Sequence, residues 1–127
     1  MIVGIGVDVV EVRRIESALE RYGERFLQRI FTQDERDYCE QFGSQRALHY
    51  AARFAAKEAF SKALGIGMHV PFCWRDVSIV NGRLGKPELR LAGQLKSCCT
   101  NYCLHVSLSH TAAHAVAVVL IEQREEQ

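Results

Sequence analysis

The segment from Arg53 to Gly65, with the sequence RFAAKEAFSKALG, constrains the fold more than any other part of the chain. Residue types that favour helix make up most of it, and no helix breaker occurs before Gly65. A period of about 3.6 residues gathers small side chains on one side of this helix, namely Ala52, Ala55, Ala56, Ala59 and Ala63. Because small side chains let another backbone lie close, the sequence predicts a rigid central helix packed tightly against a neighbour.

A charged stripe adjoins these alanines. Glu58 and Lys62 are four residues apart, so they lie one turn apart on the same side of the helix. A carboxylate and an ammonium group held on a rigid helix indicate a catalytic or binding site. The same spacing is also common on exposed helix surfaces, where such a pair contributes about 0.2–0.5 kcal/mol. The helix alone leaves both interpretations open.

The composition predicts an ordinary globular protein. A chain of 127 residues, with 48% hydrophobic and 24% charged residues, is most simply one domain over residues 1–127. The net charge of +1 gives no support for a nucleic-acid partner. No apolar run approaches the roughly 20 residues of a membrane helix, and the N-terminus lacks the features of a signal peptide. We therefore expect no nucleic-acid or membrane partner and a cytoplasmic location.

The chain contains five cysteines, an odd number, and no secretory signal is recognisable. We therefore expect reduced thiols, as in the cytosol. Three of them cluster in sequence, namely Cys98, Cys99 and Cys103, but no C-x-x-C spacing occurs. Small buried side chains are the favoured interpretation of the cluster, and a zinc site is the weaker alternative. The other two are Cys39 and Cys73.

The N-terminal run Ile2–Val10 is predicted to form a buried strand, because it is apolar and rich in β-branched residues. Alternation places Gly4, Gly6 and Asp8 on one face, and Val3, Ile5, Val7 and Val9 on the other. Glycine in a strand often marks the close approach of another backbone or a ligand. A carboxylate among valines is costly to bury unless it is paired or bound to a metal. A helix cap is the alternative role for Asp8.

Amphipathic segments precede the central helix. Glu11–Tyr22 is predicted to form a helix with one apolar face, on which lie Val12, Ile15, Leu19 and Tyr22. Its exposed side carries Arg13, Arg14 and Arg21, which suit either solvent or an acidic partner. A second apolar stripe follows. Thr32 and Glu35 then form the capping-box pattern that opens a helix ending at Gly43, and Ser44 is the predicted cap of the central helix.

The second half of the chain is predicted to be rich in strands. Trp74–Val80 alternates as a strand, and Asn81-Gly82 is typical of a two-residue hairpin turn. Leu89–Cys99 is predicted to be a short helix. Two further strands are expected at Cys103–Ser109 and His114–Ile121. This order predicts an α+β fold, with a mostly antiparallel sheet wrapped against the long central helix.

A carboxylate pair is the first candidate site. If the first strand packs on the central helix, Asp8 and Glu58 come together. Two acidic ligands and nearby cations are what Mg²⁺ needs when it also binds the phosphates of a substrate. The basic residues available to neutralise such phosphates are Arg53, Lys57, Lys62 and Lys86.

Two other kinds of site have weaker support. Alternation gathers polar side chains on one face of the strand Cys103–Ser109, namely His105, Ser107 and Ser109, with His110 just beyond. No nucleophile elbow and no third member of a hydrolase triad accompany them. The glycine pairs Gly4-x-Gly6 and Gly65-x-Gly67 lack the remaining glycines and the lysine of a phosphate-binding loop.

Several motifs together resemble one family. Gly6-Val7-Asp8 is followed by the helix of residues 53–65, then by Asn81-Gly82, Gly85-Lys86-Pro87 and the segment HVSLSHT of residues 105–111. In this order and spacing they resemble the 4′-phosphopantetheinyl transferases, and among these the short type, the holo-acyl-carrier-protein synthases. The resemblance covers nearly the whole chain. The segment MHVPFCW of residues 68–74 and the Cys98-Cys99 pair depart from the commoner pattern.

The resemblance implies a reaction. Phosphopantetheine would be transferred from coenzyme A to a serine of apo acyl carrier protein, releasing 3′,5′-ADP. It also implies that Asp8 and Glu58 bind Mg²⁺, with Mn²⁺ as a substitute, and that Lys62 contacts the phosphates and protonates the departing one. The base that takes the serine proton would be Glu58 or a metal-bound water. These roles agree with the demands of phosphoryl transfer, which are mainly positioning and charge neutralisation.

The resemblance further implies binding sites and an assembly. The residues implied in coenzyme A binding are Arg53, Lys62, Gly65, Lys86, Pro87 and His105, with Arg53 and His105 near the 3′-phosphate. Arg14, helped by Arg13 and Arg21, would meet the acidic carrier protein. A homotrimer with active sites between subunits and a role in fatty acid biosynthesis are implied as well. The alternatives are a non-catalytic trimer that binds coenzyme A or carrier protein, and another magnesium-dependent transferase acting on a nucleotide pyrophosphate.

Overall fold

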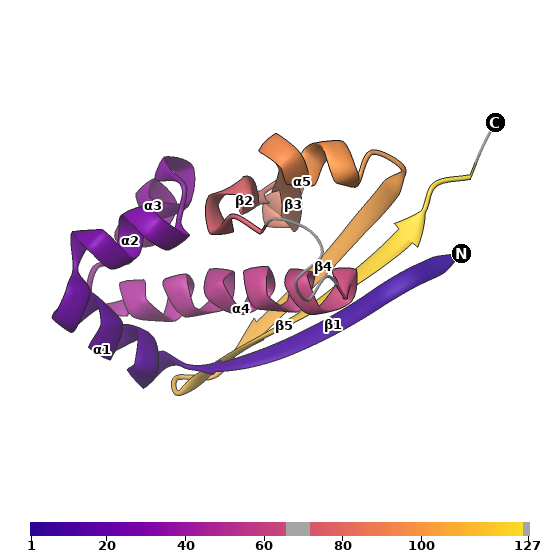
Figure 1. The fold of residues 1–127 in the computed structure, drawn as a ribbon. Coiled ribbons are helices and arrows are strands. Elements are labelled where there is room, and N and C mark those ends of the chain that lie inside the picture. The colour runs from indigo at the N-terminus through magenta and orange to yellow at the C-terminus, as the bar shows by residue number, and fades with distance from the viewer. Residues whose placement is uncertain (66–71, 126–127) are drawn as a thin grey trace.

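A long helix, α4, crosses one face of a three-stranded sheet (Figure 1). The computed structural model describes residues 1–65 and 72–125. In chain order the strands and α-helices are β1 (Ile2–Glu11), α1 (Val12–Tyr22), α2 (Glu24–Ile30), α3 (Gln33–Glu40), α4 (Arg46–Leu64), β2 (Val77–Asn81), β3 (Pro87–Leu91), α5 (Gly93–Cys98), β4 (Tyr102–His110) and β5 (His114–Gln123). Short 3₁₀ turns lie at Gly43–Gln45, Trp74–Asp76 and Arg83–Gly85.

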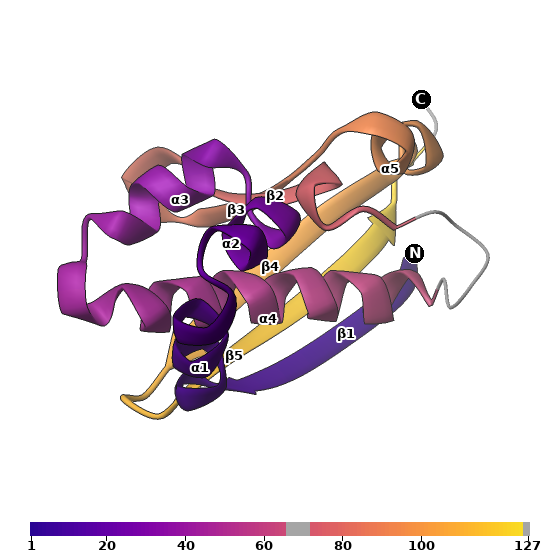
Figure 2. The ribbon, with the colours of Figure 1, turned by 60° about the vertical axis from the view of Figure 1, so that its left-hand side comes forward.

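The strands form two antiparallel sheets. The larger has the order β1-β5-β4, and the smaller is the hairpin of β2 and β3. Figure 2 shows α1, α2 and α3 gathered around one end of α4, with the hairpin of β2 and β3 next to α2 and α3. The predicted α+β fold, a mostly antiparallel sheet against a long central helix, is confirmed. No helix within residues 1–65 and 72–125 is long and apolar enough to cross a membrane.

The glycine face of β1 packs directly on α4. A Cβ atom at Gly6 would overlap the backbone oxygen of Ala59, and one at Gly4 would overlap that of Ala63. Both alanines are buried on the side of α4 that faces the sheet. The predicted close approach of a backbone to the alanine stripe is therefore confirmed, and it fixes where Asp8 lies along the helix.

The opposite face of β1 corrects a prediction. Val3, Ile5, Val7 and Val9 were expected in a buried strand, but they are exposed, with Ile5 at 66%. The reason is that α4 covers only one face of the sheet, so alternate residues of β1 project away from it. The register continues this apolar surface onto β5, because Ile5 pairs with Leu120 and Val7 with Val118. We call the surface formed by Val3, Ile5, Val7, Val9, Val118 and Leu120 the outer face.

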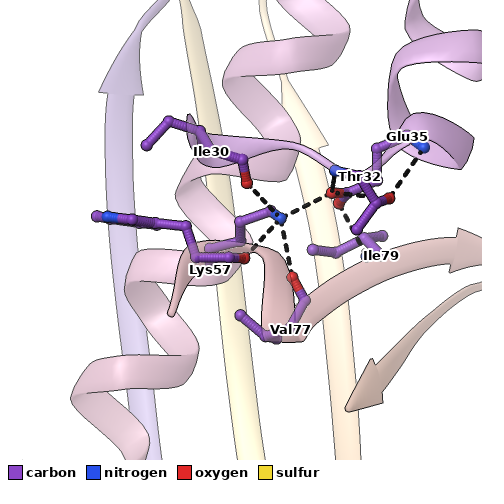
Figure 3. A network of polar contacts seen from close by, with 7 residues as sticks. Ile30, Thr32, Glu35, Lys57, Val77 and Ile79 are labelled. Carbon is purple, nitrogen blue, oxygen red and sulfur yellow. Dashed lines mark hydrogen bonds and ion pairs between the residues drawn. The ribbon is translucent and has the colours of Figure 1, made fainter. Parts of the chain in front are cut away.

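A buried ion pair joins α4 to the helical layer and to the hairpin (Figure 3). The Lys57 amino group lies 2.7 Å from Oε1 of Glu35 and donates to the backbone oxygens of Ile30, Trp74 and Val77. Oε2 of Glu35 accepts from the backbone N–H of Ile79. The predicted availability of Lys57 to phosphates is therefore wrong, because its side chain is fully buried and its donors are used.

Some of the predicted helix caps and helix ends are confirmed, and others are wrong. The predicted capping box of Thr32 and Glu35 is present, and Gly65 ends α4 with φ 61°. The preceding helix ends at Glu40 rather than Gly43, and Ser44 lies in a 3₁₀ turn instead of capping α4. Tyr22 was expected on a buried face but is 54% exposed, because it occupies the last turn of α1. Gly67, expected to help end the helix, lies outside the described residues.

Three predictions for the second half are wrong. The segment Trp74–Val80 begins with a 3₁₀ turn, and only its end belongs to β2. Asn81 pairs with Pro87, so a longer loop replaces the two-residue turn, and its left-handed residues are Leu84 and Gly85. The segment Leu89–Cys99 is divided between β3 and α5. Leu89 and Leu91 alternate and pair with buried residues of β2, which a strand allows and a helix does not.

Candidate functional site

Asp8 and Lys62 form an ion pair between β1 and α4. Nζ of Lys62 lies 2.9 Å from Oδ1 of Asp8 and 3.1 Å from the backbone oxygen of Val7. The Asp8 side chain is only 15% exposed, whereas that of Lys62 is 53% exposed. The packing of Gly6 on α4 brings the two together. Asp8 is thus paired, as its place in an apolar strand required, and it does not cap α1.

Glu58 completes the cluster without an ion pair of its own among the described residues. Partial burial raises the pKa of its carboxyl group, and the negative charge of Asp8 raises it further. Lys62 and Arg14 act in the opposite direction. The simple surface pair of Glu58 with Lys62 is therefore not formed, because Lys62 is bound to Asp8 instead. The hydrogen bond that Lys62 donates to Asp8 raises the pKa of the Lys62 amino group.

The donor set of this cluster suits a hard divalent cation. The carboxylates of Asp8 and Glu58 lie close enough for the negative charge of Asp8 to disfavour the ionised form of Glu58. A cation bound by both oxygens would reverse that effect. Oxygen ligands with room left for water and phosphate are the arrangement that Mg²⁺ prefers.

The arginines of α1 lie on its solvent side, as expected. Arg13, Arg14 and Arg21 are exposed, while Val12 and Ile15 of the same helix are buried. Arg14 is near enough to Glu58 for its charge to lower the pKa of that carboxyl group. Arg14 therefore lies near the Asp8–Glu58–Lys62 cluster.

A second cluster of predicted residues lines a groove between β3, α5 and β4. Lys86, Pro87 and His105 lie in this groove, which has a volume of about 650 Å³. Two further cations, Lys96 and Arg124, share its walls. Such a positively charged groove can accept an anionic ligand. Asp8, Glu58 and Lys62 are not among the lining residues.

The sheet separates these two clusters. Asp8 pairs with Ala117, which is buried under α4, whereas His105 pairs with Leu120 on the opposite face. The strands that carry them, β1 and β4, flank β5. Within one chain, Asp8 and His105 therefore project from opposite faces of the sheet.

Arg53 and Gly65 do not line the groove. The Arg53 side chain is almost fully buried, with its guanidinium carbon 4.1 Å from the ring centroid of Tyr38. Its Nε atom has no hydrogen-bond partner within the described parts of the chain. Its burial was not predicted from the sequence, which offered Arg53 only as a cation available to phosphates. The segment 68–74 that departs from the commoner pattern is described only from residue 72.

Sequence and structure comparisons place the chain in a family. The model of the 4′-phosphopantetheinyl transferase superfamily matches residues 4–119. The chain belongs to this superfamily, and the predicted enzyme class, a phosphopantetheinyl transferase, is confirmed.

Three relatives show which members of the superfamily the chain resembles. The chain is 46% identical over 127 residues to the holo-[acyl-carrier-protein] synthase of Geobacter sulfurreducens, with 97% of this chain and 99% of the relative covered. The crystal structure of the synthase from Neisseria meningitidis is similar with a TM-score of 0.87 and 34% identity, over 97% of this chain and 100% of that one. The synthase from Bacillus anthracis, solved in complex with CoA (3′,5′-ADP), gives a TM-score of 0.79 and 37% identity, over 97% and 98%.

Proposed function

We propose that this protein is a single-domain enzyme that transfers phosphopantetheine from coenzyme A to a serine of apo acyl carrier protein, for fatty acid biosynthesis in the cytoplasm. The serine oxygen forms a bond to phosphorus, and the bond from that phosphorus to the departing 3′,5′-ADP breaks. The observation that carries the proposal is the cluster of Asp8, Glu58 and Lys62. The names of the relatives and the complex of the Bacillus anthracis synthase with CoA support it.

In this proposal Asp8 and Glu58 hold Mg²⁺, for which Mn²⁺ can substitute, and the ion supplies neutralising charge to the phosphates of the substrate. Lys62 provides an ammonium group beside the carboxylates, and half of its side chain is exposed to an incoming substrate. It stabilises charge on the departing phosphate and donates a proton to it. Glu58, whose carboxylate lies beside the reacting groups in this proposal, takes the serine proton directly or through a water.

Coenzyme A is assigned to the groove that carries Lys86, Pro87 and His105. Its basic lining suits a ligand with several phosphates. Arg53 and Gly65 remain part of the proposed site as residues of α4 and its end. Because Asp8 and His105 face opposite sides of the sheet, one ligand would reach both clusters most directly where two copies of the chain meet.

The outer face provides the surface for such an assembly, which we propose is a homotrimer with active sites between subunits. Contiguous exposed patches of large apolar side chains commonly mark protein interfaces. Ile5→Glu should therefore convert the assembly into monomers, as measured by light scattering. Leu84→Glu is the matched control, because Leu84 is fully exposed but lies in the hairpin loop. Monomeric wild-type protein, or an unchanged mass for Ile5→Glu, would contradict the assignment.

A mass-spectrometric assay tests the function. Apo acyl carrier protein is incubated with coenzyme A, Mg²⁺ and the enzyme, and the carrier protein should gain the mass of one phosphopantetheine. Binding of coenzyme A without a mass gain would favour the non-catalytic alternative. Turnover of another nucleotide pyrophosphate with no change in the carrier protein would favour the other transferase.

Arg14 is proposed to recognise an acidic surface of the carrier protein, helped by Arg13 and Arg21. Exposed charges mainly steer association, and salt screens them at a distance of about 8 Å. Arg14→Glu should therefore weaken binding of the carrier protein, and wild-type binding should weaken as salt rises. The affinity for coenzyme A, measured by calorimetry, should stay nearly constant in the variant. Equal losses for both ligands would indicate a folding defect, and no loss would remove Arg14 from the site.

A further inference from the structure

A thiol, an imidazole and a carboxylate meet at one end of the sheet. Cys103 and His105 are two residues apart on β4, so both project to the side away from α4. Glu122 of β5 is paired with Cys103 and projects to the same side. One ligand atom from each of the three residues lies within 4.8 Å of the others.

The spacing of these atoms is close to that of a metal site. Bond lengths of about 2.0–2.3 Å in tetrahedral zinc sites place neighbouring ligand atoms roughly 3.3–3.8 Å apart. Nε2 of His105 and Oε1 of Glu122 lie 2.6 Å apart in a hydrogen bond, so a bound ion would replace that hydrogen bond and separate the two atoms slightly. Side-chain rotations alone would bring Cys103 into range, because all three side chains lie on one strand pair at the surface. The fourth position remains open to solvent or to another ligand.

The chemistry of the ligands selects the metal. A thiolate and an imidazole favour Zn²⁺ over Mg²⁺, which prefers oxygen ligands only. The cluster differs from the carboxylate pair in this respect and lies on the opposite side of the sheet. It also differs from the cysteine cluster considered from the sequence, because Cys99 is buried and Cys98 does not belong to the group.

We propose that Cys103, His105 and Glu122 form a Zn²⁺ site, and that the bound ion competes with coenzyme A by occupying His105. The second part rests on the proposed function, which assigns His105 to the coenzyme A groove. Zn²⁺ binding displaces the proton of the thiol and any proton shared by His105 and Glu122. Lys86 and Arg124 line the same groove and disfavour a cation, so the site is expected to bind Zn²⁺ reversibly.

Co²⁺ provides a spectroscopic test that does not depend on activity. Metal-free protein titrated with Co²⁺ should develop a thiolate-to-metal charge-transfer band and intense tetrahedral d–d bands, which Zn²⁺ then abolishes. Cys103→Ser should remove the charge-transfer band and lower the affinity for Zn²⁺ by more than about tenfold. Cys98→Ser is the matched control, because Cys98 is an exposed thiol outside the cluster, and it should keep both.

Each outcome decides one part of the proposal. A charge-transfer band that survives in Cys103→Ser, or no band in the wild type, overturns the metal site. Coenzyme A affinity, measured by calorimetry with and without Zn²⁺, should fall in the wild type and change little in Cys103→Ser. Equal affinity in both conditions overturns the competition alone. If the protein supplied with Mg²⁺ alone does not bind coenzyme A, the proposed function fails while the Co²⁺ spectrum still tests the site.

Discussion

Asp8→Asn is expected to lower turnover by roughly a hundredfold or more at a fixed Mg²⁺ concentration, the scale on which loss of one charge-stabilising group acts. The amide has the shape of the carboxylate but no charge, so it is a poorer ligand for a hard cation. It also releases Lys62 from its ion pair and removes the charge that raises the pKa of Glu58. Initial rates of phosphopantetheine transfer measured across a Mg²⁺ titration would show the loss and a higher requirement for the metal.

The control for this variant is Glu11→Gln, which removes an exposed carboxylate three residues further along the same strand. It should keep wild-type turnover and the wild-type Mg²⁺ dependence. Thermal unfolding of Asp8→Asn should resemble that of the wild type, because the ion pair it breaks is at the surface. Full activity of Asp8→Asn at the same Mg²⁺ concentration would remove Asp8 from the metal site.

The sequence was informative about β1 and α4 because both carry a strong local pattern. Gly4 and Gly6 alternate on the face that meets the alanines, so the close packing could be predicted. The same alternation could not show that the valine face is uncovered, because coverage depends on where distant helices pack. The hairpin was misjudged for a similar reason, since the pairing of Leu89 with Ile79 on β2 outweighs the local signal for helix.

The sequence predicted which residues come together at the candidate site, but not which of them contact each other. Asp8, Glu58 and Lys62 were grouped correctly, yet helical spacing favoured a Glu58–Lys62 pair, and the structure pairs Lys62 with Asp8. Spacing on one helix describes only that helix, whereas the partner comes from a strand that is far away in the sequence. Only the family resemblance singled out His105 as a binding residue, and the structure places it in the groove.

The ion pair of Lys57 and Glu35 was missed because each residue has a simpler local explanation. Glu35 was interpreted only as part of a capping box, and Lys57 as a cation available to phosphates. In the structure Glu35 has both roles. Its Oε1 accepts from the backbone N–H of Thr32, which completes the capping box, and also from the Lys57 amino group. Lys57 precedes Glu58 directly on α4, so this buried contact fixes the helix that presents the carboxylate.

Lys57→Met is expected to destabilise the fold by about 3–5 kcal/mol, the range for breaking one side of a buried ion pair. The change leaves the Glu35 carboxylate buried without its cation, and it leaves three backbone oxygens without a donor. Burial lowers the pKa of the Lys57 amino group, while the negative charge of Glu35 raises it. Removing either partner therefore leaves the other buried without its opposite charge. Denaturant unfolding at a fixed protein concentration measures the effect.

Two further variants separate the ion pair from a general effect of methionine. Lys62→Met replaces a half-exposed lysine of the same helix and should destabilise the fold far less than Lys57→Met, because its ion pair with Asp8 is open to solvent. The double variant Lys57→Met with Glu35→Met removes both charges together and should recover part of the loss, because no unpaired charge remains buried. If Lys57→Met fails to fold, recovery in the double variant still tests the pair. A double variant less stable than the sum of its single changes, or a Lys57→Met protein as stable as the wild type, would show that the pair does not hold the hairpin to α4.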